Sequence, residues 1–224
     1  TAATTKVAIR ATAYTEQSSD AQRSIVSSNV NDASAGTGAR TVRVIYCTST
    51  GAGPYTEIFT LNGTTPVNSV ASDICFIEDI QVITVGNGGT NAGIISLKAS
   101  TGGGGATIWS IAAGDGQTFG CHHYIPLNRQ MHITGVSLMH NGTVVGSGGL
   151  FGIFQRPIGV TDAFESQVSD FLRLYGQSSM VNRNYDSLIE VAGPARVTMY
   201  VTPESSSSLI YRAAFDFYDH SHES

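Results

Sequence analysis

The chain has 224 residues, of which 41% are hydrophobic and 13% are charged, and its formal net charge is −5. The 12 Lys and Arg residues form no basic cluster, which argues against sequence-independent binding of nucleic acid and against an anionic membrane partner. A charged fraction this far below the usual ~25% is typical of a surface that neighbouring subunits cover.

The three cysteines, Cys47, Cys75 and Cys121, are odd in number and widely spaced. We therefore expect reduced, partly buried thiols and no disulfide framework. The sequence has no run of 18 apolar residues and no secretory signal, so it predicts no membrane span. Because Thr1 is a small residue of the kind left when an initiator Met is removed, we expect the chain to be complete.

The first 39 residues have little to bury. A strand is expected over residues 6–14, but residues 15–39 are mostly Ser, Asn, Asp, Gln, Ala and Gly, with one apolar pair, Ile25-Val26. We expect residues 1–39 to form an extended N-terminal arm or loop. The arm is either flexible or docked on a neighbouring subunit.

Strand signals begin at residue 40 and continue almost to the end. Alternating β-branched and aromatic residues predict strands over 41–46 and 55–61, followed by a turn at Asn62-Gly63. Further runs recur about every 8 to 15 residues, with glycine-rich turns between them, which indicates a jelly-roll-like β-sandwich and not βαβ units. The predicted strand runs are 74–85, 94–98, 107–111, 118–125, 131–140, 149–155, 197–202 and 209–217.

One segment is ambiguous. Residues 161–175 are the one candidate helix, with Thr161 as N-cap and apolar residues at helical spacing, but a loop followed by a strand at 171–175 fits equally well. In the last two strands we expect Val197, Met199 and Val201, and the set beginning at Leu209, to face the core. The predicted organisation is a single sandwich over residues 40–219 and a polar tail over 220–224.

The middle of the chain contains Cys and His residues that could bind a metal ion. Cys121-His122-His123 is a tempting motif, and His132 and His140 follow it. Neighbouring strand residues point to opposite faces, so His122 and His123 do not share one ion, and His132 and His140 would lie roughly 26 Å apart on a straight strand. Neither spacing matches a zinc motif, so we predict no metal site. His220 and His222 are expected to be solvated.

The sequence offers no catalytic motif either. It has no Gly-x-Ser-x-Gly elbow, and the glycine run at 101–106 lacks the Gly-Lys-Ser/Thr ending of a phosphate loop. The Asn-Gly-Thr sequences at 62–64 and 141–143 are better explained as turns than as glycosylation acceptors. We expect no enzyme activity and no cofactor. Carboxylates that could pair for glycoside cleavage are candidates by residue type alone: Glu57, Glu78, Asp79, Glu165 and Asp216.

A family resemblance lies in the first two predicted strands, Ala35-Gly-Thr-Gly-Ala-Arg-Thr-Val-Arg-Val-Ile-Tyr46 and Tyr55-Thr-Glu-Ile-Phe-Thr-Leu-Asn-Gly-Thr-Thr-Pro-Val67. It continues in order through residues 80–86, 91–94, 111–118, 124–126 and 211–218. In these residues the chain resembles a family of small virion structural proteins of tailed bacteriophages. The Cys121-His122-His123 element is not part of that resemblance.

The resemblance implies a non-enzymatic β-sandwich in a virus particle, assembled in the host cytoplasm. The leading hypothesis is a capsid cement or decoration protein that forms a homotrimer or homodimer and contacts the major capsid protein, with no nucleic-acid or membrane partner. The alternatives are a tail, baseplate or neck component, a capsid-attached glycosidase, and a receptor- or glycan-binding module that uses Trp109 or tyrosines as its platform.

Overall fold

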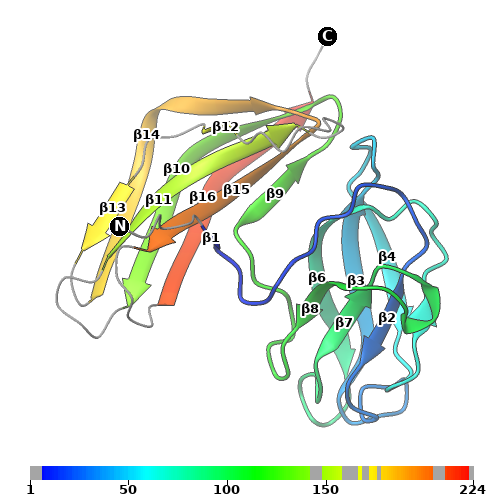
Figure 1. Ribbon diagram of the computed structural model, residues 1–224. Coiled ribbons are helices and arrows are strands. Elements are labelled where there is room, and N and C mark those ends of the chain that lie inside the picture. Colours follow the sequence, from blue (N-terminus) through cyan, green and yellow to red (C-terminus); the bar gives the residue numbers. More distant parts are fainter. Residues whose placement is uncertain are drawn as a thin grey trace. The chain divides into compact units, whose positions relative to one another are not determined.

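The computed structural model is built almost entirely from antiparallel strands, which confirms the predicted all-β class (Figure 1). The structure describes residues 7–141, 148–157, 166–167, 172–175, 178–203 and 210–221. Among these residues, one three-residue 3-10 turn, η1 (Thr101–Gly103), is the sole helical element. The chain divides into two compact units. We call Arg10–Gly120 the N-terminal sandwich, and Thr1–Ile9 together with Cys121–Ser224 the C-terminal sandwich.

The N-terminal sandwich contains two sheets. The first has the order β5 (Val67–Asn68), β2 (Ser24–Ser27), β7 (Ile95–Lys98), β8 (Thr107–Ile111). The second has the order β4 (Tyr55–Thr60), β3 (Ala39–Cys47), β6 (Phe76–Val85). Side chains from both sheets fill one core, whose largest members are Trp109, Phe59, Ile25, Leu61, Ile74, Ile77, Ile80, Ile95, Leu97 and Ile108.

Strand β3 shows how the alternating sequence produces a half-buried strand. Val42 and Val44 are fully buried, whereas Arg43 between them lies on the other face, where its guanidinium donates to the side chain of Gln81. A strand of period two with one wet face gives this result. The predicted turn after β4 is also present, because Gly63 has a φ of 60°, a conformation that glycine adopts without steric cost.

The prediction of an N-terminal arm over residues 1–39 is wrong for most of that range, because residues 10–39 belong to the N-terminal sandwich. Strand β2 is an interior strand, and Ile25 on it is fully buried. Arg23 is also buried and donates from Nε to the carbonyl oxygen of Ile74 at 3.0 Å. Its terminal nitrogens donate to the carbonyl oxygens of Ala99 and Ser19. Hydrogen bonds from polar side chains to the backbone order this stretch, and a hydrophobicity pattern does not reveal them.

Asp32 is the second buried charge in that stretch. Its Oδ1 accepts the N–H groups of Ala39 and Ala92, both at 2.8 Å. Its Oδ2 accepts the Ser27 hydroxyl at 2.6 Å and the Gly93 N–H at 2.9 Å. A buried carboxylate is tolerated only when it is hydrogen-bonded in this way. The contacts join β2, the start of β3 and the loop before β7.

The C-terminal sandwich also has two sheets. In the first, β15 (Ala195–Pro203) pairs with β1 (Val7–Ala8), β9 (His122–Ile125) and β11 (Gly148–Pro157), and β11 pairs with β12 (Ser166–Gln167) and β13 (Leu172–Tyr175). The second has the order β14 (Ser178–Ala192), β10 (Arg129–Asn141), β16 (Ile210–Ser221). Val197, Met199 and Val201 are buried, as predicted. The core also contains Ile125, Met131, Ile133, Val136, Leu138, Phe151, Ile153 and Val191.

A β-bulge in the middle strand keeps that core continuous. The register of β10 shifts between Ile133 and Gly135 against both of its neighbours. Ile133 and Val136 are three residues apart and would face opposite sides of a regular strand, yet both are buried. The hydroxyl of Thr134, inside the bulge, donates to the carbonyl oxygen of Asp216 at 2.9 Å.

The division of the chain differs from the predicted single sandwich over residues 40–219. The units divide between Gly120 and Cys121, and Val7 pairs with Val201 on β15. Long-range pairing of this kind leaves no change in composition at the boundary. The predicted polar tail is also wrong in part, because residues 220–221 end β16 and only 222–224 lie outside the described residues.

The ambiguous segment at residues 161–175 is described in two places. Ser166–Gln167 and Leu172–Tyr175 are short strands that pair with β11. A continuous helix is therefore wrong, and the strand alternative is confirmed for residues 172–175. The predicted N-cap, Thr161, lies outside the described residues.

Candidate functional site

A group of polar and aromatic side chains lies on the outer face of the β14-β10-β16 sheet. Register places His132 on β10 opposite Glu190 on β14 and opposite Tyr218 on β16. Gln130, two residues before His132, is opposite His220. Because residues two apart share a face of a strand, all five side chains are brought to one surface, which we call the His132 cluster.

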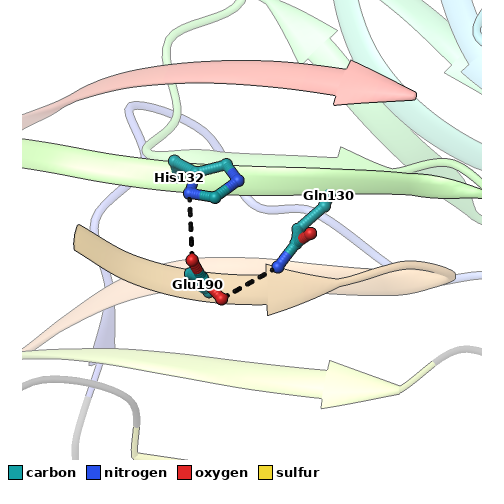
Figure 2. A network of polar contacts seen from close by, with 3 residues as sticks. All are labelled: Gln130, His132 and Glu190. Carbon is teal, nitrogen blue, oxygen red and sulfur yellow. Dashed lines mark hydrogen bonds and ion pairs between the residues drawn. The ribbon is translucent and has the colours of Figure 1, made fainter. Parts of the chain in front are cut away.

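Glu190 links two of these side chains, as Figure 2 shows. The Gln130 Nε2 donates to Glu190 Oε2 at 3.1 Å, and His132 Nδ1 lies 3.6 Å from Glu190 Oε1. The second distance is that of an ion pair when the imidazole is protonated, and it is too long for a hydrogen bond. The side chain of Glu190 is 58% exposed, so solvent screens its charge.

Aromatic contacts bury the imidazole although it lies on the face away from the core. The His132 ring stacks on Tyr218 with centroids 4.9 Å apart and an interplanar angle of 6°. It also stacks on His220 at 4.6 Å. As a result His132 is only 6% exposed, and its Nε2 has no hydrogen-bond partner among the described residues. The cluster therefore combines a shielded imidazole with an open carboxylate and an exposed phenol.

A surface ion pair joins the same two strands near their ends, on the sheet face opposite to the cluster. Arg129 Nη2 is 2.8 Å from Asp219 Oδ1, and both side chains are about one-third exposed. Arg129 is opposite Ser221 and Asp219 is opposite Met131, so the pair reaches diagonally between the ends of β10 and β16. Such a pair contributes roughly 0–1 kcal/mol, so it fixes register more than it adds stability.

The predicted Cys121-His122-His123 motif is held inside the fold. Cys121 belongs to the core of the C-terminal sandwich, and burial raises its thiol pKa to about 12. The His123 ring lies 4.6 Å from the ring of Phe217, whereas His122 contacts Tyr124 on the same strand. Alternation thus separates the two imidazoles, as predicted. Within the described residues no three His, Cys, Asp or Glu side chains are grouped as metal ligands.

The other predicted histidines divide between the cluster and the residues that are not described. His132 and His220 meet in the His132 cluster, which their separation in sequence did not suggest. The expectation that His220 is solvated is met only in part, since it is exposed but also stacked on His132. The side chains of His140 and His222 lie outside the described residues.

Two of the candidate carboxylates, Glu57 and Asp79, are not paired for glycoside cleavage. Glu57 is opposite the buried Val44 in the β3–β4 register, and its carboxylate accepts two backbone N–H groups from residues 70–71. Asp79 is opposite Ile45 in the β3–β6 register, which places it on the other face of the same sheet. Its carboxylate accepts a hydrogen bond from the Thr118 hydroxyl at 2.6 Å. Two carboxylates on opposite faces of a sheet cannot act on one glycosidic bond. Glu165 lies outside the described residues.

Two other predicted features have structural roles. Trp109 is only 1% exposed, in the core of the N-terminal sandwich. The prediction that its ring forms a platform for a sugar is therefore wrong. In the glycine run, the Gly102 N–H donates to Asn68 Oδ1 at 2.7 Å and the Gly103 N–H donates to Ser24 Oγ at 2.9 Å. These donors are already used within the fold, as expected for a turn that does not bind phosphate.

Comparisons with known proteins add no family. No family model matches the sequence, and no curated protein matches it. One solved structure, described as the structure of infectious bursal disease virus Gx strain, matches with a TM-score of 0.23 and 10% identity, over 88% of this chain and 54% of that chain. This chain therefore spans about half the length of that one, and so low a TM-score carries no argument about fold or function.

Across the residues for which positions are described, no helix is long and apolar enough to cross a bilayer.

Proposed function

We propose that this protein is a structural component of a tailed-phage virion, and specifically a capsid cement or decoration protein. In this role it forms a homotrimer or homodimer and stabilises the head through non-covalent contacts with major capsid subunits. The resemblance over residues 35–218 supports the virion role. The structural observation that carries the proposal is the set of large apolar side chains left open on a surface with few charges.

The open apolar side chains are spread over both sandwiches. Val70 is 93% exposed, Val30 is 69% exposed and Ile58 is 60% exposed in the N-terminal sandwich, and Met180 is 63% exposed in the C-terminal sandwich. Single exposed apolar residues are ordinary, but several of them on a chain that is only 13% charged favour surfaces that other subunits cover.

The internal polar groups support the same role. Arg23 and Asp32 are buried and hydrogen-bonded to the protein's own backbone. Burial raises the pKa of each of the three thiols to about 12, which suppresses the reactive thiolate. These charged groups and thiols are thus buried within the fold and are not available for catalysis, which is consistent with a structural role.

The test compares phage particles with and without this protein. We expect particles that lack it to release DNA at a lower temperature or on milder osmotic shock, and added purified protein to restore their resistance. Equal resistance of the two kinds of particle would refute the cement role. An averaged image of the virion separates the head from the tail, baseplate and neck, which are the alternative locations.

A receptor- or glycan-binding module is the second candidate, and the His132 cluster is the observation that favours it. Tyr218 on β16 is 48% exposed, and the carboxylate of Glu190 on β14 is open to solvent on the other side of β10. An exposed ring and a hydrogen-bond acceptor on the same sheet face, two strands apart, can together hold a sugar, the ring by stacking and the carboxylate by accepting a hydroxyl group. Binding of the full chain to host cells or a glycan array should then fall in Tyr218→Ala. It should not change in Tyr55→Ala, a similarly exposed tyrosine in the other sandwich.

A further inference from the structure

The N-terminal sandwich covers most of its sheet edges with its own chain. The β4-β3-β6 sheet has β4 and β6 as its edges. The β6 edge is covered, because the Val82 N–H donates to the Gly116 carbonyl oxygen at 2.7 Å and the Thr118 N–H donates to the Ile80 carbonyl oxygen at 2.9 Å. Covering an edge in this way removes a template for pairing with another chain.

The other sheet is covered in the same manner. On edge strand β8, the Ile108 carbonyl oxygen accepts the Thr15 N–H at 2.7 Å, and the Ser110 carbonyl oxygen accepts the Thr12 hydroxyl at 2.8 Å. The opposite edge strand, β5, is only two residues long. Strand β4 is the exception: within the described residues, no backbone bond reaches its outer edge.

Alternation identifies the backbone groups that β4 leaves open. The Leu61 N–H donates to the Arg40 carbonyl oxygen at 2.9 Å, which makes this pair a hydrogen-bonded one. The backbone N–H and C=O groups of the odd-numbered residues of β4 therefore also point towards β3. The backbone groups of Thr56, Ile58 and Thr60 face away from the sheet. Each of these three residues presents one N–H and one C=O to solvent.

The side chains of the same three residues are exposed, and the strand has no residue that blocks an edge. Residues 55–60 include no Lys, Arg or Pro, and their register with β3 has no bulge. The single charge, Glu57, faces inward, where its carboxylate accepts the N–H groups of residues 70–71. The edge that remains is a neutral Thr-x-Ile-x-Thr strand.

From this we infer that β4 pairs antiparallel with β4 of a second copy of this chain, about a twofold axis at Ile58. The two three-stranded sheets then become one six-stranded sheet. The inference goes beyond the virion role and does not depend on it. The partner is a second copy because the strand is complementary to itself in this register.

Self-complementarity follows from the order of the side chains. About the axis, Ile58 lies opposite Ile58 of the second copy, and Thr56 lies opposite Thr60 of the second copy. Thr–Thr and β-branched cross-strand pairs are favourable. On the inner face Glu57 lies opposite Phe59 of the second copy, so no like charges meet. Three outward residues on each strand supply about six hydrogen bonds.

Cross-linking tests this register directly. In a hydrogen-bonded pair the two Cα atoms are about 5.5 Å apart, within the range of a disulfide. We expect Ile58→Cys, in the full chain under mild oxidation, to give a dimer on a non-reducing gel. Thr56→Cys is the matched control, because Thr56 of the two copies would be about 14 Å apart. The double variant Thr56→Cys, Thr60→Cys should cross-link.

Solution mass supplies the second measurement. We expect the full chain to be dimeric by light scattering at ~100 μM, and Ile58→Lys to be monomeric because it places two ammonium groups opposite each other. Val30→Lys, at another exposed apolar site of the same sandwich, should leave the dimer unchanged. Fluorescence of the buried Trp109 shows in each variant that the sandwich is folded.

Three results would overturn the inference. The first is a wild-type chain that is monomeric at that concentration, and the second is an oligomer that Ile58→Lys does not change. The third is cross-linking of Thr56→Cys as rapid as that of Ile58→Cys. A failed cement test leaves these three measurements unaffected, since they need no virion.

Discussion

Asp32 offers the sharpest test of how the N-terminal sandwich is held together. Its buried carboxylate accepts four hydrogen bonds, of which three come from backbone N–H groups of Ala39, Ala92 and Gly93. In Asp32→Ala those donors lose their acceptor in a site without solvent. Each such loss costs ~1–3 kcal/mol, so the free energy of unfolding should fall by roughly 4–6 kcal/mol. That is a large part of the ~5–15 kcal/mol of a typical domain.

Asp32→Asn separates charge from shape. The amide keeps one oxygen, which can accept the Ala39 and Ala92 N–H groups, but its NH₂ faces the Gly93 N–H. We expect a smaller loss of roughly 1–3 kcal/mol, for one unpaired donor and weaker neutral hydrogen bonds. Asp115→Ala is the control, because Asp115 is exposed in a turn and should change stability by less than ~0.5 kcal/mol.

Urea unfolding followed by tryptophan fluorescence is the assay. Trp109 is the single tryptophan of the chain and is buried in the same sandwich as Asp32, so it reports on the unit that the substitution affects. An unchanged slope of free energy against urea shows that the same surface unfolds in each variant. A loss below ~1 kcal/mol in Asp32→Ala would refute the assignment of the carboxylate as the centre of this hydrogen-bond network.

The remaining predictions concern the thiols, a close backbone approach and the His132 cluster. Burial raises the pKa of the three thiols from 9.0 to about 12, so between these pH values the folded chain keeps protons that the unfolded chain releases. The free energy of unfolding should therefore be unaffected by the thiols below pH 9 and should fall as the pH rises towards 12. For the same reason, thiol reagents at pH 8 should label the protein only after unfolding. Gly193→Ala should destabilise the C-terminal sandwich by ~2 kcal/mol or more, because its Cβ would lie 2.0 Å from the Pro126 carbonyl oxygen. His132→Phe should leave stability equal or higher, because the buried Nε2 has no partner among the described residues and a stacked phenyl ring needs none.

Each of these predictions has its own control and measurement. Thermal melting across pH 7–12 follows the thiol effect, and native labelling as fast as that of a free cysteine would contradict it. Gly104→Ala is the control for Gly193→Ala, since its Cβ would meet nothing closer than 3.4 Å; equal melting temperatures for the two would show that the close approach relaxes freely. A loss above ~1.5 kcal/mol in His132→Phe would mean that the imidazole nitrogens are bonded after all.

The sequence predicted the all-β class because strand periodicity is a local signal. Alternation in β15 identified Val197, Met199 and Val201 as core residues, and the Asn62-Gly63 dipeptide identified a turn. Local patterns also separated His122 from His123, since that result needs only the two-residue period of a strand.

Tertiary structure decided the features that depend on long-range pairing. The pairing of β1 with β15 places β1 in the C-terminal sandwich, and composition does not mark this assignment. Residues 10–39 are ordered by the polar contacts of Arg23 and Asp32, which a hydrophobicity pattern counts as loop residues. The His132 cluster needs the registers of β14, β10 and β16 together.

The open edge of β4 shows the same division. Its sequence identifies a neutral strand with threonines on either side of Ile58. Only the sheet order shows that this strand is an edge, and only the hydrogen bonds on β6 and β8 show that those longer edges are covered whereas β4 is not, within the described N-terminal sandwich. A strand's own residues set its periodicity and charge, whereas its neighbours are set by contacts between residues far apart in the chain.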